Sequence, residues 1–539
     1  MDKKRNFKTI VLSSIVISSL IFGCKKHDLN KVTGVTFDQN LAVPIGYGEF
    51  GVHDLLKSID STLQVNPTDG SMVLVYHKQI DTIYAKDVVT LDDFSQNFNI
   101  VPSSLAANAS GAFNGVINSS SSQNYNYVTQ NGTELHDLNF QSGNLAISVS
   151  STIKHNITLL IAFPDLTLNG NVVSTTVNMI YPNSVPQTAN TSIDLANVLA
   201  DFTANKTAIN TLRVVVNATV TGTGQQLVGN ENLNMKMNLT NLNFKNITGY
   251  FGQKTLASFT DSMLLKIFED PLPGNLNFTN PKITFTVDNS FGIPITVNFN
   301  SLSTINPTNN QVTQITFNNP IQSIKVPSAM GAPTVKTEIE LSNATTNNTL
   351  FNLVEGTPKY LKYDISAISN PNANVPPLNF IESTSKMIIK GDVELPLEGY
   401  ASGMEVSDTL KFDKLSSAPD QIESVLFRLK VDNAFPITFN GQAEFLDENY
   451  NHLFNLFDTS TEIIKAAPVN PVTHLSNGKV SNTIDVILSS SKIALIDKVS
   501  YVVLHGIAET TKPLNTVVKI LDTYKIGLKL SVQVQLKGK

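Results

Sequence analysis

Apolar and polar residues alternate with a period of two along most of this chain. The pattern is clear at 212–217 and 233–238, where Leu, Val or Met occupies every second position, and clusters of Asn, Gly and Pro separate such runs. This period places alternate side chains on opposite faces of a strand, and short strands between turn residues are typical of β sandwiches and barrels. Helical spacing is clearest at 53–59. The pattern therefore predicts an all-β, mainly antiparallel, sandwich-like and multi-domain body with few short helices.

The second half of the chain contains an internal repeat. Val287–Thr296 recurs as Val431–Thr438, and upstream of it Gly249-Tyr250 and Asp261–Leu264 recur as Gly399-Tyr400 and Asp408-Thr409-Leu410, with offsets of 144, 150 and 147 (432−288, 399−249 and 408−261). Order and spacing held over this length predict two related β units. Whether the two units form one body or two domains stays open.

The repeat suggests a division of the chain into successive segments. We expect an N-terminal β domain at 37–225, a first β unit at 226–375 and a second at 376–539, after a signal peptide at 1–23 and a tether at 24–36. Residues 103–132 are rich in Ser, Asn and Ala, with Phe113, Tyr125 and Tyr127 as their aromatic residues. Such a composition predicts a long surface excursion or partial disorder.

Each copy of the repeat places an asparagine between two strands. Asn289 or Asn433 offers a side chain that can bond its own backbone in a turn, and the proline that follows marks a bend or an edge. This layout resembles the β-sandwich of the LEA-14/WHy type over a short part of each copy. More broadly, Gly249–Gln253, Asn289–Pro294, Glu394–Tyr400 and Asn433–Pro436 resemble a group of uncharacterised Bacteroidota lipoproteins. That resemblance implies that the protein is located at the outer membrane, and it implies no enzymatic activity.

The N-terminus has the features of a lipoprotein signal peptide. Four basic residues at positions 3, 4, 5 and 8 precede an uncharged, largely apolar run from Thr9 to Phe22, and Gly23-Cys24 follows. A run of about 14 residues is short of the roughly 20 that span a bilayer, but it suits a signal peptide. Cys24 is the chain's single cysteine. We therefore predict acylation of Cys24, including palmitate, and permanent anchoring through several acyl chains.

Composition narrows the classes of function. The chain has 38 Lys and Arg against 44 Asp and Glu, a net charge of −6, and no basic stripe. Nucleic-acid binding therefore has no electrostatic footprint. Only 15% of the residues are charged, below the usual ~25%. This neutral, polar surface suits an extracytoplasmic protein, and no cofactor is expected.

Two short patterns in the sequence match known binding motifs. Gly46–Gly51 reads G-x-G-x-x-G, but a dinucleotide site needs a complete βαβ unit, so a glycine-rich turn is the preferred interpretation. Asp447, Asn449, Asn451 and Asp458 fall at positions 1, 3, 5 and 12 of a calcium-type loop. Position 6, which requires glycine, is His452. A polar turn between strands is the alternative to a metal site there.

Three further tripeptides match a modification pattern. Asp81-Thr82-Ile83, Asp261-Ser262-Met263 and Asp408-Thr409-Leu410 are similar to the O-glycosylation acceptor of Bacteroidota, which makes Thr82, Ser262 and Thr409 candidate sites.

The sequence favours a non-catalytic role. We expect a structural or interaction module of the outer envelope, such as an adhesion or assembly accessory with an envelope partner. The alternative is a carrier of lipids or other hydrophobic ligands, because the strand from Met72 to Tyr76 is apolar on both faces. Lys25-Lys26-His27-Asp28 carries a single acidic residue after the anchor, which favours the periplasmic face of the outer membrane over the cell surface.

Overall fold

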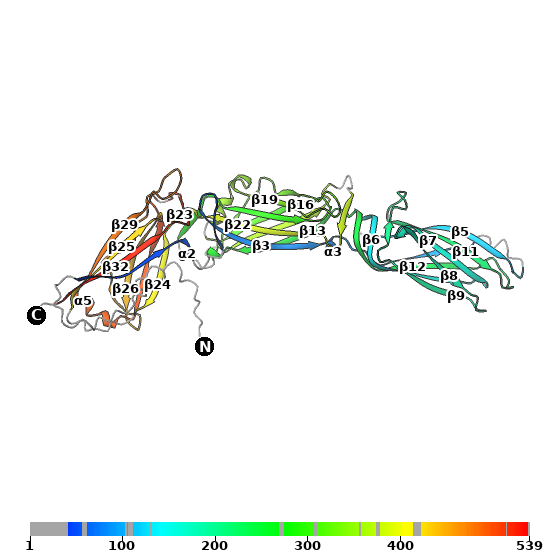
Figure 1. Cartoon of the computed structure of the whole chain (residues 1–539), viewed down its shortest axis with the longest axis horizontal. Coiled ribbons are helices and arrows are strands. Elements are labelled where there is room, and N and C mark those ends of the chain that lie inside the picture. The colour runs from blue at the N-terminus through cyan, green and yellow to red at the C-terminus, as the bar shows by residue number, and fades with distance from the viewer. Residues whose placement is uncertain are drawn as a thin grey trace.

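The computed structural model describes residues 41–56, 62–102, 105, 111–129, 132–268, 274–306, 310–354, 357–372, 378–412, 422–513 and 515–536. Strands dominate these residues, and the helices span no more than five residues each. The predicted all-β, mainly antiparallel fold is confirmed. Figure 1 shows three β bodies in a row, which we call the near, middle and distal bodies.

The near body holds the first and the last described strands. One of its sheets has the order β1-β32-β25-β29, and the other has β24-β30-β26-β27 with β28 also paired to β26. The strands are β1 (Leu41–Phe50), β24 (Met404–Lys411), β25 (Ile422–Asn433), β26 (Ile437–Leu446), β27 (His452–Asn455), β28 (Thr461–Ile464), β29 (Val480–Leu488), β30 (Tyr501–Thr510) and β32 (Ile526–Leu536). Short helices accompany them: α2 (Val52–Leu55), α5 (Ser490–Ile493) and η7 (Ile496–Lys498).

The middle body repeats this arrangement. Its sheets have the orders β19-β15-β22-β3-β2 and β13-β20-β16-β17, with β18 also paired to β16. The strands are β2 (Leu63–Val65), β3 (Met72–Tyr84), β13 (Lys254–Leu264), β15 (Lys282–Asn289), β16 (Ile295–Ile305), β17 (Val312–Gln314), β18 (Ile321–Ile324), β19 (Val335–Leu341), β20 (Tyr360–Ser369) and β22 (Lys386–Pro396). The helices are α3 (Ala85–Val88), η3 (Lys266–Phe268), η4 (Asn343–Thr345) and η5 (Leu350–Val354).

The distal body is a single folded sheet, because β10 pairs with both β6 and β7 and so joins its two halves. Its strands are β4 (Phe94–Asn99), β5 (Val116–Asn126), β6 (Glu134–Ser151), β7 (Asn156–Leu168), β8 (Asn171–Met179), β9 (Gln187–Asp194), β10 (Leu199–Asp201), β11 (Thr211–Thr221) and β12 (Leu233–Tyr250). The middle body adds β21 (Asn379–Glu382) to this sheet by pairing it with β12.

The distal body is a third copy of the same unit. In each body the last strand pairs with the first (β32 with β1, β22 with β3, β12 with β4). In the near and middle bodies the last strand also pairs with the strand that ends at the repeat's asparagine, β25 or β15. In the distal body the last strand pairs with β6, which has the same position. Edge strands β24, β13 and β5 pair with β30, β20 and β11 in the same way. The sequence repeat revealed only two of these three copies.

The three copies are nested rather than consecutive. The chain lays down the first strands β1, β3 and β4 in turn, completes the distal body, and then returns to close the middle and near bodies with β22 and β32. The expected segment 37–225 therefore contributes to all three bodies, and its boundary at 225 falls inside the distal sheet. Linear segmentation fails here because antiparallel pairing joins strands that are far apart in the sequence.

The prediction of a surface excursion or partial disorder at 103–132 is wrong for most of the described residues of this segment. Residues 103–104, 106–110 and 130–131 lie outside the described part, but 116–126 form β5, which pairs with β11 along its whole length. Ile117 and Tyr125 of β5 point into the core, and Tyr125 is fully buried. Backbone pairing and two inward side chains are enough to hold a strand whose other residues are mostly Ser and Asn.

Candidate functional site

In the near and middle bodies a buried asparagine ties the two sheets together. Asn433 accepts a hydrogen bond at Oδ1 from the Phe435 amide (2.8 Å) and donates from Nδ2 to the carbonyls of Phe435 (2.8 Å) and Lys465 (2.7 Å). In the middle body, Asn289 makes the matching bonds with Phe291 and with the Lys325 carbonyl (2.9 Å). The predicted self-bonding turn is thus present in both copies. We call this end of each body its corner end.

The corner ends of the near and middle bodies carry the next body. In the near body, the Ile520 carbonyl accepts from the amide of Met72, which starts β3 of the middle body (3.0 Å). In the middle body, Gly292 forms a bridge with Phe380 of β21, and β21 pairs with β12 of the distal body. The joint between the near and middle bodies also contains the small sheet β14 (Asn275–Phe278), β23 (Glu398–Ser402) and β31 (Val518–Lys519).

The glycines of the repeat lie in these two joints. Gly249 pairs with Asn379 of β21, and Gly399 pairs with Val518 of β31. A Cβ atom at Gly249 would lie 1.9 Å from the Glu134 carbonyl oxygen, and one at Gly399 would lie 1.8 Å from that of Asn277. The backbones therefore approach closely at both joints, which explains why the Gly-Tyr pair belongs to the repeat.

The predicted anchor, Cys24, lies outside the described residues. The described chain begins at Leu41, which pairs with Val534 near the end of the last strand. This is the end of the near body that faces away from the middle body, so the start of the described chain and the distal body lie at opposite ends of the row (Figure 1).

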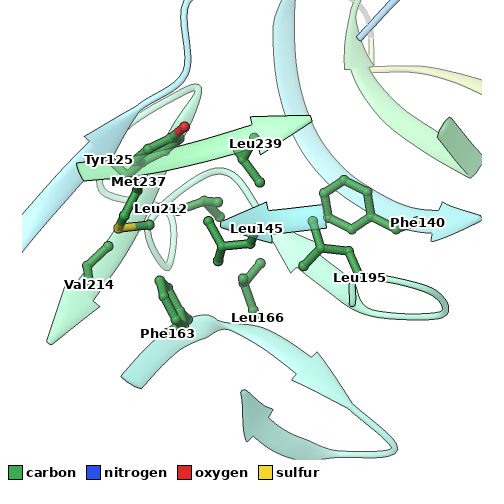
Figure 2. A pocket seen from close by; sticks show the side chains of 10 residues that line it. All are labelled: Tyr125, Phe140, Leu145, Phe163, Leu166, Leu195, Leu212, Val214, Met237 and Leu239. Atoms are coloured by element: carbon green, nitrogen blue, oxygen red, sulfur yellow. The ribbon is translucent and has the colours of Figure 1, made fainter. Parts of the chain in front are cut away.

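The interior of the distal body is filled. Figure 2 shows ten side chains around one internal space of this body, all apolar except for the tyrosine hydroxyl. That space amounts to about 10 Å³, which is barely room for one water molecule. Pockets for small molecules usually measure about 300–1,000 Å³. The residues are Tyr125, Phe140, Leu145, Phe163, Leu166, Leu195, Leu212, Val214, Met237 and Leu239.

A second cavity, of about 120 Å³, lies where the middle and distal bodies meet. It is lined from both sides, by Asp87 and Val88 of α3 and by Tyr127 and Leu135 of the distal body. Lys254 also lines it and donates from Nζ to the Val88 carbonyl. Burial lowers the pKa of the Lys254 ammonium. The cavity is polar and small, so it can hold ordered water at the joint.

Three of the four candidate calcium residues, Asp447, Asn449 and Asn451, form a turn. The Asp447 carboxylate accepts from the amides of Asn449 (2.8 Å) and Asn451 (2.9 Å) and from the Asn451 side chain (3.0 Å). These bonds, that from the Asn451 side chain above all, lower the pKa of Asp447. Asp458 lies beyond β27, is fully exposed and pairs with Lys492 at 3.6 Å. Among the described residues, no group of three or more His, Cys, Asp or Glu gathers as a metal site.

The glycosylation candidates all lie in strands. Thr82 belongs to β3 and Ser262 to β13, where the neighbouring Asp261 forms an ion pair with Lys78; Thr409 is exposed in β24. Modification of these residues stays a prediction.

The G-x-G-x-x-G segment is not a turn: residues 46–50 pair with β32, and Gly51 precedes α2.

Sequence reasoning missed the low charge of the distal body. Residues 94–250 contain 11 charged side chains in 157 positions, against 71 in the other 382 (82 − 11 and 539 − 157). A charge count taken along the chain could have found this difference, whereas the net charge concealed it.

Comparison with solved structures gives several likenesses, among them one of low similarity. No protein-family model matches the chain, and no curated protein matches it. A crystal structure of a protein described as secreted, from Parabacteroides distasonis, is similar at 15% identity and a TM-score of 0.30, over 53% of this chain and 83% of that one. In the described part of the chain, every helix is too short to cross a membrane.

Proposed function

We propose that this protein is a non-catalytic lipoprotein of the outer envelope that acts as a rigid spacer and interaction module. The observation that carries the proposal is the nested topology. It returns the chain to the near body after building the distal body, so that β1 and β32 pair at one end of the row while β5–β9 form the other (Figure 1).

Acylation of Cys24 would make the near body the membrane-proximal part. At roughly 3.3 Å per residue, one strand from each body in succession spans on the order of 100 Å. Hydrogen-bonded strands at both joints make the row stiff, because β21 and β31 each pair with strands at a body boundary. The distal body would then be held well away from the lipid surface.

The filled interior supports a structural role over the carrier alternative. Leu74 and Tyr76, from the strand that suggested a carrier, are buried in the core of the middle body, and the Tyr76 hydroxyl accepts from the Ile267 amide (3.1 Å). Burial raises the pKa of Tyr76 to about 12. Core packing explains the face of this strand that carries Leu74 and Tyr76, and Val73 and Val75 on the other face are half-buried, so we do not extend the proposal to lipid transport.

Metabolic labelling with palmitate tests the anchor. The native chain should take up label and fractionate with the outer membrane, and Cys24→Ser should do neither. Ser407→Ala, an exposed change in β24, serves as the control. Equal labelling of the native chain and Cys24→Ser would overturn the anchor.

Protease treatment of intact cells tests orientation. We expect protection in intact cells and cleavage after the outer membrane is permeabilised, as a periplasmic address requires. Cleavage in intact cells would move the protein to the cell surface and leave the spacer role in place. In-cell crosslinking from the distal body should yield a protein adduct, and the absence of any adduct would argue against an interaction role.

A further inference from the structure

Tyr450 and Tyr501 stack on each other at the end of the near body that faces away from the middle body. Their ring centroids lie 4.4 Å apart, and the planes of the two rings differ by 10°. The two phenol rings therefore face each other in close contact. Every other ring contact among the described residues includes a phenylalanine, so this one is distinguished by having a hydroxyl on both rings.

The fold fixes the position of both rings. Tyr501 begins β30 and pairs across the sheet with Leu446, the last residue of β26. The turn that follows β26 brings Tyr450 back over Tyr501, and the Tyr450 amide donates to the Asp447 carbonyl in this turn (3.2 Å). Tyr450 has a φ of 63°, a left-handed conformation that bulky residues rarely adopt. The backbone thus holds the Tyr450 ring against its neighbour.

The pair is also open to solvent. Tyr450 is 53% exposed, and Tyr501 is half-buried. Tyr125 and Tyr127 of the distal body are buried, and their ring contacts are with phenylalanines. Tyr47 is 85% exposed but has no ring contact among the described residues. Solvent access and contact between two phenols therefore coincide at Tyr450 and Tyr501, which is the arrangement that oxidative coupling of tyrosines requires.

We propose that Tyr450 and Tyr501 are the site of a carbon–carbon crosslink made by a one-electron oxidant of the haem peroxidase class acting with hydrogen peroxide. Each phenol loses one electron and its hydroxyl proton and becomes a neutral phenoxyl radical. Its unpaired electron is shared with the ring carbons beside the oxygen. One such carbon of each ring joins the other, and the hydrogens that these carbons carried move to the two oxygens, which restores both phenols as dityrosine. The two electrons and two protons that leave the pair reduce one hydrogen peroxide to two water molecules.

The crosslink would act as a staple in a chain without disulfides. The sequence has a single cysteine, Cys24, so no disulfide can form within one chain. A bond between Tyr450 and Tyr501 joins residues that are 51 positions apart (501 − 450) and ties the turn after β26 to the start of β30. A crosslink that closes a loop restricts the unfolded chain far more than the folded one. The modified near body should therefore melt at a higher temperature than the unmodified one.

The crosslink depends neither on the anchor nor on the spacer role, so it can fail or succeed separately from them. A chain that begins at Lys25 keeps every described residue. Treated in dilute solution with a haem peroxidase and hydrogen peroxide, its monomers should show the blue emission of dityrosine, which is read without a tryptophan background because the chain has no tryptophan. Mass spectrometry after proteolysis should find the peptides of Tyr450 and Tyr501 joined, with two hydrogen atoms lost.

Phenylalanine removes the chemistry and keeps the stacked ring. Tyr450→Phe and Tyr501→Phe should each unfold at the native temperature before oxidation, and each should abolish the dityrosine of monomeric chains, because a ring without a hydroxyl gives no phenoxyl radical. Tyr47→Phe, at the exposed position in β1, is the matched control and should leave the yield unchanged. Oxidation should raise the melting temperature of the near body in the native chain and in Tyr47→Phe, but not in the other two variants.

Free tyrosine in a parallel reaction shows that the oxidant is active. Native monomers that then form no dityrosine, or a yield that survives Tyr450→Phe, would overturn the proposal. The full chain isolated from cells exposed to hydrogen peroxide should carry the joined peptides of Tyr450 and Tyr501, in a larger fraction than the chain from untreated cells. Their absence from the exposed cells would show that the pair is not modified where the protein resides, and would also count against the proposal.

Discussion

Gln187 and Ser151 face each other across β9 and β6, and together they bond the backbone of the segment that follows β6, as a single asparagine bonds the segment that follows it in the other two bodies. The Ser151 hydroxyl accepts from the Ile153 amide (3.1 Å), as Asn433 Oδ1 accepts from Phe435. The Gln187 amide donates to the carbonyls of Ile153 (2.8 Å) and His155 (2.9 Å). The corner is thus kept while its residues differ.

Replacing Asn433 should destabilise the near body. Asn433→Ala leaves the buried Phe435 amide without its acceptor and the Lys465 carbonyl without the Asn433 donor, whereas the Phe435 carbonyl keeps its bond from the Ala467 amide. Each buried polar group left without a partner costs about 1–3 kcal/mol. We expect a loss of about 2–4 kcal/mol in urea unfolding, confined to the transition of the near body. Asn449→Ala, at an exposed position of the same body, should change stability little. An equal effect of both changes would contradict the corner's role.

The distal corner can be tested by exchanging its two residues. In the middle and near bodies a valine faces the asparagine, Val335 opposite Asn289 and Val480 opposite Asn433. Gln187→Val places the same residue type opposite Ser151, and it should destabilise the distal body because the two carbonyl bonds of Gln187 are lost. Adding Ser151→Asn should restore part of the loss, because the asparagine can supply both the acceptor and the donor. A double-mutant cycle on distal-body unfolding measures this coupling, and additive losses would show that the third corner works differently.

The contrast between these corners explains what the sequence could predict. Asn289 and Asn433 recur with their neighbours, so the repeat, the turn and the strands on either side were predictable from the residues. In the distal body the same bonds come from a serine and from a glutamine 36 positions away (187 − 151), and no local pattern joins them. The third copy is therefore defined by strand pairing rather than by sequence.

Two other predictions from the sequence differ from the structure because the contacts that decide them are not visible in a local pattern. β5 was hidden by its Ser and Asn content, although its alternation of Ile117 and Tyr125 with polar residues fits a strand. The candidate metal residues Asp447 and Asp458 satisfy a spacing rule, but Asp447 holds a turn and Asp458 faces Lys492.

The joint glycines should not accept a side chain. Gly249→Ala places a Cβ within 2 Å of the Glu134 oxygen of β6, and Gly399→Ala places one within 2 Å of the Asn277 oxygen of β14. β12 must therefore move away from β6, and β23 from β14, at the ends where these strands reach the joints. Limited proteolysis should then cut between the bodies, and small-angle scattering should report a more flexible particle. Gly527→Ala in β32, where a Cβ would lie 3.8 Å from its nearest neighbour, Asp432 of β25, is the control. Unchanged proteolysis in all three would show that the joints do not depend on this close approach.

Calcium should leave the stability of the near body unchanged. The Asp447 carboxylate is already bonded to Asn449 and Asn451, so a cation would have to displace these donors. Asp447→Ala should lower the melting temperature of the near body equally with calcium and with a chelator. A calcium-dependent rise in the native chain that Asp447→Ala abolishes would restore the metal site.

His155 should make the distal body sensitive to acid. The side chain is fully buried beside Phe113, its Nδ1 accepts from the Thr223 amide (3.1 Å), and its Nε2 has no partner among the described residues. Burial lowers the pKa of His155, although the nearby Glu231 opposes this shift. The unfolded chain therefore binds the proton more readily than the folded one. Stability should be complete above the ordinary histidine pKa of about 6.5 and fall as the pH drops below it.

Melting of the distal body between pH 7.5 and 5 measures this effect. His155→Gln should flatten the dependence, because glutamine offers a hydrogen-bond acceptor and does not titrate in this range. His452→Gln, an exposed histidine of the near body bonded to Asn455, should leave the dependence intact. If the native chain and His155→Gln lost stability in parallel, the acid sensitivity would belong to other groups. A flat profile in the native chain would mean that His155 reaches solvent at the end of the distal body, where its turn lies against Thr223.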